Sequence, residues 1–206
     1  MEASTKLDKS KADELVDHKV CIVTMAPIVN NDIGSTVKSL TKDQLTKIFT
    51  GETKNWKDVG GPDEEIVLVT RPTTSGTRAL FKQYAMDGKE EVSGGSLETD
   101  DSGTLLQSIE QNKGAIGYIA LSYLTGDNAS KVTALAIDGV QPTLENTYNG
   151  TYPVWGYEHM YTKGEATGAA KAFIDFIQSE QYGQKMESLG YGVTSKLSDK
   201  AVESHK

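Results

Sequence analysis

The amino-acid sequence predicts an α/β fold in which strands and helices alternate along the chain. Short apolar runs rich in β-branched residues, at 20–29 and 64–70, are typical of buried strands. Segments with apolar residues at helical spacing lie between such runs, and single glycines separate the two kinds of segment. The chain has 206 residues and no internal repeat, so it is long enough for one large domain or two small ones.

The first part of the chain predicts a helix followed by a strand. Residues 1–19 are polar and predict a helical start, with Ser10 as its N-cap and Leu15 and Val16 on its apolar side. Residues 20–29, VCIVTMAPIV, are continuously apolar and predict a strand buried on both faces. Burial of both faces is typical of a parallel sheet, which we therefore expect here.

The next elements surround a loop of small polar residues. Thr41, with Gln44 three residues later, forms a capping-box pattern for a helix that ends at Gly51. Residues 64–70 predict a strand that leads into the loop RPTTSGT and then into a helical segment, RALFKQYAM. The expected arrangement is a mostly parallel sheet with helices on both faces, and with this loop at the carboxyl end of its strands.

The second half continues the alternation. The remaining elements expected from the pattern are a helix at 103–112 closed by Gly114, a strand at 115–121, an aromatic-rich extended segment at 153–161, a helix at 168–179, and a helical continuation at 181–189.

Composition excludes several classes of protein. With 29 acidic and 21 basic residues, the formal net charge of −8 argues against nucleic acid or an anionic membrane as a partner. Cys21 is the single cysteine, and no Cys and His cluster has metal-ligand spacing, so no disulfide, metal or cofactor is expected. The charged first twenty residues and the lack of a long apolar stretch predict no export signal in the chain as written.

The loop of residues 71–77 has the features of an oxyanion site. Backbone N–H groups at a helix N-terminus, here at Ser75, Gly76 and Thr77, together with the positive end of the helix dipole, favour an anion. The side-chain hydroxyls add neutral donors, and Arg71 has the planar fork suited to phosphate or sulfate. A purely structural N-cap with a solvated arginine is the alternative interpretation of the same residues.

Two other interpretations of this loop are excluded by its spacing. It lacks the G-x-x-x-x-G-K-[ST] pattern of a Walker loop. Ser75 lies in TTSGT rather than in G-x-S-x-G, and no histidine or lysine base stands nearby, so a hydrolase with a Ser75 nucleophile is not expected.

Several longer segments resemble a known family. LTKDQLTKIFTGETKNWKDVGG, VTRPTTSGTRALF, KGAIGYIALSYL, YPVWGYEHMYTKGE and the terminal LGYG are similar to the phosphate-binding subunits of bacterial high-affinity phosphate ABC transporters. These proteins belong to the type II periplasmic-binding-protein superfamily, in which two α/β lobes close on the ligand. The resemblance covers nearly the whole chain.

The resemblance implies a set of site residues. It gives the arginine role to Arg71, and the hydroxyl and amide roles to Ser75, Gly76 and Thr77. It also implies that residues 114–118 form part of the cleft wall. Some members have an acid two positions after the arginine to orient it, but Thr73 stands at that place here, which leaves the partner of Arg71 open.

The resemblance also implies an uneven architecture. Family members begin with a signal peptide, in Gram-positive bacteria a lipoprotein one, and a first-lobe segment that has no counterpart ahead of Met1 in this sequence. We therefore expect a truncated form, with 27–151 as a near-complete phosphate-binding lobe and with 1–26 and 152–206 as an incomplete second lobe.

The implied function is a non-enzymatic one. The resemblance predicts an extracellular, membrane-anchored receptor that passes inorganic phosphate to ABC transporter permease subunits, with possible self-association of the truncated form. An oxyanion-sensing regulatory module of the same fold, for sulfate, molybdate or phosphate, is the alternative.

Overall fold

The computed structural model describes residues 14–92 and 97–205. Its strands are β1 (Leu15–Val29), β2 (Ser39–Leu40), β3 (Val67–Thr70), β4 (Leu97–Glu98), β5 (Ala115–Ala120), β6 (Thr133–Ala134), β7 (Ala136–Ile137) and β8 (Trp155–Lys163). Its α-helices are α2 (Asn31–Thr36), α3 (Lys42–Phe49), α4 (Gly76–Ala85), α5 (Ser102–Gln111), α6 (Leu144–Tyr148), α7 (Gly168–Ile177), α8 (Glu180–Ser188) and α9 (Asp199–Glu203). Short 3-10 helices lie at Trp56–Val59, Leu121–Tyr123, Gly126–Ser130 and Thr194–Lys196.

One mixed sheet organises these elements. Its strand order is β4-β3-β5-β1-β6, with β8 also paired to β1, and β2 and β7 form a separate parallel pair. Strand β3 runs parallel to both β4 and β5, as predicted. Strand β1 is antiparallel to β5, β6 and β8, so the expectation of a parallel neighbour for the 20–29 strand is wrong.

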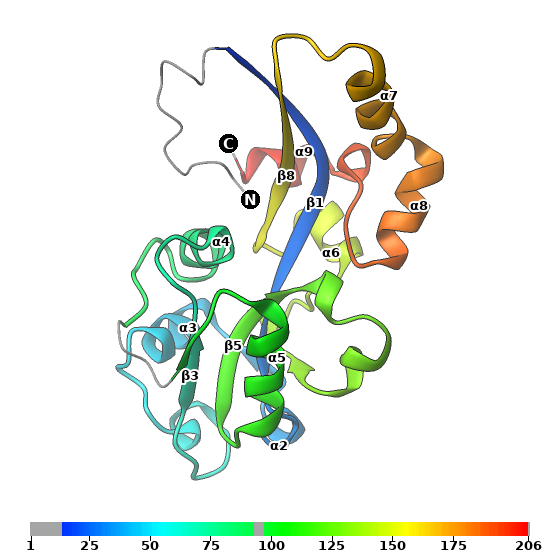
Figure 1. The fold of residues 1–206 in the computed structure, drawn as a ribbon. Coiled ribbons are helices and arrows are strands. Elements are labelled where there is room, and N and C mark those ends of the chain that lie inside the picture. The colour runs from blue at the N-terminus through cyan, green and yellow to red at the C-terminus, as the bar shows by residue number, and fades with distance from the viewer. Residues whose placement is uncertain (1–13, 93–96, 206) are drawn as a thin grey trace.

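The long strand β1 passes through two parts of the molecule (Figure 1). Its first ten residues, Leu15–Thr24, pair with β8, and Met25–Val29 pair with β5. The predicted helix therefore fails over 15–19, which is the start of this strand, and its N-cap Ser10 lies outside the described residues. Polar residues mislead there because that end of β1 is only partly buried.

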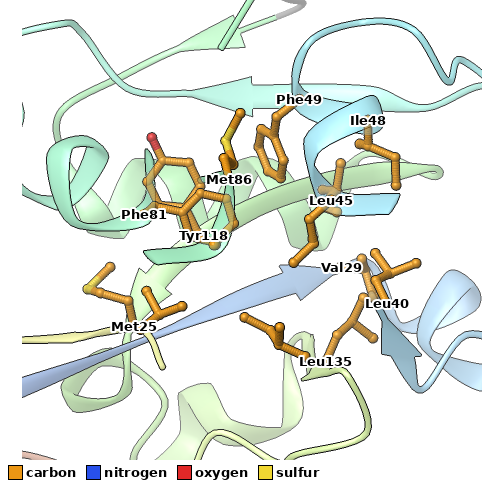
Figure 2. Close-up of a cluster of buried hydrophobic side chains, with 14 of the residues drawn as sticks. Met25, Val29, Leu40, Leu45, Ile48, Phe49, Phe81, Met86, Tyr118 and Leu135 are labelled. Carbon is orange, nitrogen blue, oxygen red and sulfur yellow. The ribbon is translucent and has the colours of Figure 1, made fainter. Parts of the chain in front are cut away.

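Helices cover both faces of the sheet, as predicted. Successive residues of β1 enter different cores, because strand side chains alternate between faces. Ile28 packs with Leu105 and Ile109 of α5, whereas Val29 belongs to the larger core with α3 and α4. Figure 2 shows that larger core, in which Phe49 and Phe81 surround Tyr118. Double coverage, rather than parallel pairing, explains the continuous apolar run.

The other predicted elements agree with the structure to within a few residues. Helix α3 has the predicted capping box, since Thr41 Oγ1 accepts from the Gln44 amide and the Gln44 side chain accepts from the Thr41 amide. The glycines predicted to end helices, Gly51 and Gly114, both have positive φ. Among the described helices, none is long and apolar enough to cross a membrane.

Replacing Thr41 with alanine should lower the free energy of unfolding by about 1 kcal/mol, because one orphan amide of α3 loses its acceptor. Thr167 is a matched control, since it is the N-cap of α7 but makes no side-chain capping hydrogen bond. Thr167→Ala should cost less than about 0.5 kcal/mol. Urea unfolding of both variants measures the difference, and equal losses would show that the cap of α3 contributes nothing.

His205, near the end of the chain, stacks on aromatic rings of two elements. Its ring lies 4.0 Å from that of Tyr84 in α4 and 3.8 Å from that of Trp155 in β8, centroid to centroid. Burial lowers the pKa of His205 from 6.5 to about 4. The unfolded chain then binds the proton more tightly, so this contribution to stability is complete above about pH 6.5 and is lost as the pH falls toward about 4.

The variant His205→Phe should therefore lose less stability than the wild type between about pH 7 and about pH 4.5, because a phenyl ring stacks without titrating. Urea unfolding at the two pH values measures this. The same pH dependence in both proteins would mean that His205 is not the group responsible.

Candidate functional site

The predicted anion loop lies at the carboxyl end of β3 and leads directly into α4. Ser75 is the N-cap of α4, in an extended conformation, and its amide donates to the Pro72 carbonyl at 2.9 Å. The Ser75 side chain makes no capping hydrogen bond, whereas Thr41 and Asp101 cap α3 and α5. The first-turn amides of Gly76 and Thr77 therefore lack the side-chain acceptor that would compete with an anion.

Arg71 begins this loop and is only 2% exposed. Its Nη1 donates to the Asp100 carbonyl at 3.1 Å, and its Nη2 donates to Ser102 Oγ at 2.8 Å. Its Nε is buried and has no hydrogen-bond partner. The partners that orient Arg71, which the sequence leaves open, are therefore Asp100, just before α5, and Ser102, the first residue of α5.

Burial dominates the electrostatics of Arg71. Removal from water lowers the pKa of the guanidinium, while Tyr118 and the nearby Asp100 act in the opposite direction. The Asp100 carboxylate lies 4.0 Å from Nη1 and is itself largely exposed. An arginine remains charged despite such a shift, so a buried positive charge stands beside the loop with incomplete compensation.

A pocket of about 200 Å³ opens in front of α4. Its walls come from six separate parts of the chain: Val23 and Met25 of β1, Gly76, Thr77 and Leu80 of α4, Ser102 of α5, Ala120, Ser122 and Tyr123 at and just after the end of β5, Glu158 of β8, and Tyr191 after α8. At about 30 Å³ per water molecule, this volume has room for a five-atom oxyanion.

The four predicted residues are close in sequence but differ in their place relative to this pocket. Gly76 and Thr77 line it, whereas Ser75 and Arg71 are buried next to it and are not among its lining residues. Arg71 reaches the wall through Ser102, whose hydroxyl it holds.

Sequence reasoning misses most of the opposite wall. Ser102 and Ser122 both line the pocket, and Ser122 Oγ is buried without a hydrogen-bond partner. The expectation that residues 114–118 form part of the wall is wrong. In this part of the chain the first residue that lines the pocket is Ala120, and Tyr118 is buried in the core. Of these residues, only Ser102 could be suspected from its neighbours in the sequence, since it lies at a helix N-terminus. The others come together at the pocket only through the topology of the sheet.

This arrangement suits the recognition of an oxyanion. Two helix N-termini, those of α4 and α5, contribute Gly76, Thr77 and Ser102 to one pocket. Neutral donors of this kind bind an oxyanion without needing to ionise. In residues 14–92 and 97–205, no group of three His, Cys, Asp or Glu side chains could hold a metal ion.

The comparisons with known proteins show the family to which the chain belongs. Residues 2–181 match a family described as the PBP superfamily domain, and the chain therefore belongs to the PBP superfamily. Within it, the chain is similar to phosphate-binding proteins of ABC transporters.

Three relatives illustrate this similarity. The phosphate-binding protein PstS of Bacillus subtilis (strain 168) is 55% identical over 169 residues, which are 82% of this chain and 54% of that protein. A crystal structure of a putative phosphate ABC transporter substrate-binding protein from Clostridium perfringens, with bound phosphate, is 34% identical with a TM-score of 0.80. An ABC-type phosphate transport receptor from Vibrio cholerae is 27% identical with a TM-score of 0.69.

The relatives are longer than this chain. It spans about half the length of the curated relatives it matches. The two structural matches cover 92% and 91% of this chain and 76% of each of those chains.

Proposed function

We propose that this chain is part of an extracytoplasmic solute-binding protein that captures inorganic phosphate for an ABC transporter. The uncapped N-terminus of α4, which faces the pocket beside the buried Arg71, is the observation that supports this most strongly. The Gly76 and Thr77 amides and the Ser75 and Thr77 hydroxyls donate to the phosphate oxygens. Arg71 supplies positive charge and holds the Ser102 hydroxyl toward them.

The lobes form part of the same proposal. Residues 27–151 are the phosphate-binding lobe, and residues 1–26 with 152–206 belong to the other lobe. Strand β1 pairs with β8 up to Thr24 and with β5 from Met25 onward. This change of partner supports a lobe boundary near residue 26. The pocket has residues from both sides of that boundary, which suits a ligand held between two lobes.

The partner and the location are further parts of the proposal. ABC transporter permease subunits receive the phosphate, and the full-length protein is an extracellular lipoprotein anchored to the membrane of a Gram-positive bacterium. Self-association through α7, where Phe173 and Phe176 are 56% and 50% exposed, completes the proposal. No catalytic role is proposed, and the names of the relatives favour phosphate transport over an oxyanion-sensing regulatory role.

Calorimetric titration with phosphate, sulfate and molybdate tests the proposed ligand. Phosphate should bind with one-to-one stoichiometry, as expected for a single oxyanion pocket. Binding of sulfate or molybdate without binding of phosphate would replace the proposal with the oxyanion-sensing alternative.

A further inference from the structure

A second arginine lies directly beneath the anion loop. Arg78 stands in the first turn of α4, where a positive charge opposes the helix dipole, and it is only 6% exposed. Its Nη1 donates to the backbone carbonyl of Arg71 at 2.7 Å, and its Nη2 lies 3.4 Å from the Glu90 carboxylate. The guanidinium therefore holds, by a hydrogen bond, the first peptide unit of the loop that leads to Gly76 and Thr77.

A buried carboxylate stands behind this arginine. The Glu91 side chain is fully buried and accepts a hydrogen bond from the Tyr118 hydroxyl. Its second oxygen, Oε2, has no hydrogen-bond partner and lies 3.9 Å from Arg78 Nη1. Removing two charged groups from water costs so much free energy that a buried ion pair often adds nothing to stability. The presence of this pair therefore calls for a role other than stabilisation.

These contacts form one continuous path. Tyr118 fixes Glu91, Glu91 faces Arg78, and Arg78 holds the carbonyl of Arg71. Asp100 and Ser102 hold the side chain of Arg71 separately. Arg78 therefore acts on the position of the Arg71 backbone carbonyl. We propose that Glu91 is a positioning residue of the phosphate site, which acts in its ionised form by holding Arg78 against the loop. This inference rests on the proposed function.

The charge of Glu91 is sensitive to pH. Burial raises the pKa of its carboxyl, and Glu90 raises it further, while the Tyr118 hydroxyl, Arg78 and the Arg71 backbone amide lower it. Burial is the largest of these influences, so Glu91 takes up a proton at a higher pH than an ordinary glutamate. The protonated carboxyl attracts Arg78 less, and phosphate affinity should fall with it.

Calorimetry on Glu91→Gln measures this effect, because glutamine resembles the protonated glutamate. At about pH 8 the variant should bind phosphate about tenfold more weakly than the wild type. The ratio of the two dissociation constants cancels the titration of phosphate itself, and it should fall toward one as the pH is lowered through the raised pKa of Glu91. Glu90→Gln is the matched control, since Glu90 also contacts Arg78 but is 61% exposed, and it should change affinity less than about twofold.

A second measurement does not depend on phosphate. In the ligand-free wild type, the ¹³C resonance of the Arg71 carbonyl should move with pH over the range in which the affinity ratio changes. It should not move in Glu91→Gln. If that variant does not fold, Arg78→Lys provides the affinity test, because it keeps the charge but cannot reach both partners, and it should also bind about tenfold more weakly at about pH 8.

The outcomes are distinguishable. A constant affinity ratio, an equal loss in Glu90→Gln, or a wild-type Arg71 carbonyl that does not titrate would overturn the role of Glu91. A wild type that binds no phosphate would overturn the proposed function instead. The pH dependence of the Arg71 carbonyl resonance would then be the measurement that tests whether Glu91 positions the loop.

Discussion

Replacing Arg71 with alanine should weaken phosphate binding about 10- to 150-fold, because hydrogen bonds involving a charged group are worth roughly 1.5–3 kcal/mol. Arg71 is nearly fully buried next to the pocket, and its guanidinium orients Ser102 of the pocket wall. Isothermal titration calorimetry measures the loss. Lys82→Ala is the control. Lys82 is a positively charged residue of α4, the helix that follows the loop, but it pairs with Glu90 rather than with a pocket residue.

Two further measurements separate the role of Arg71 from general effects. Urea unfolding checks stability, because Asp100 and Ser102 lose their partner in the alanine variant. Arg71→Lys keeps the charge but loses the planar fork, and it should still bind more weakly than the wild type. Equal losses in Arg71→Ala and Lys82→Ala would indicate binding by a diffuse field. Such binding is not expected in a chain of net charge −8, and we expect only weak salt dependence.

Replacing Gly114 with alanine should destabilise the protein by about 3 kcal/mol or more, which is among the largest effects expected of any single substitution here. Gly114 has a φ of +77°, and an added Cβ would lie 2.3 Å from the Glu65 carbonyl oxygen. Its own carbonyl accepts from the Trp56 indole at 2.8 Å and from the Val67 amide at 3.1 Å, so the backbone cannot move without breaking both contacts.

Gly88→Ala is the matched control for this prediction. Gly88 has a φ of +79°, but nothing lies within 4 Å of an added Cβ. Its replacement should cost only the backbone strain, about 1–2 kcal/mol. Denaturant unfolding of the two variants gives the difference, and similar losses would show that the close approach to the Glu65 carbonyl contributes nothing.

Local sequence patterns are sufficient to predict most of the helices and the sheet core. The capping box at Thr41 and the glycine ends at Gly51 and Gly114 depend only on neighbours in the chain, and the structure confirms them. Strand pairing depends on partners far away. Leu15 pairs with Lys163, and no pattern near Leu15 contains that information, which is why the start of β1 resembles a helix.

The same distinction applies to the site. The loop at 71–77 is recognisable because an arginine, hydroxyls and a glycine precede a helix, and the structure places them at the carboxyl end of β3. The partners of the Arg71 side chain, Asp100 and Ser102, lie about thirty residues further on. Glu158 reaches the pocket only because β8 pairs with β1. Such contacts require the assembled fold.

Titration of isotope-labelled protein with phosphate, followed through the backbone amide resonances of Gly76 and Thr77, tests most directly whether the α4 N-terminus binds the ion. Both resonances should move downfield and saturate together, since each amide gains a charged acceptor. The same titration on Arg71→Ala should need a higher phosphate concentration for saturation. Saturable shifts elsewhere in the chain, with Gly76 and Thr77 unmoved, would contradict the proposed site.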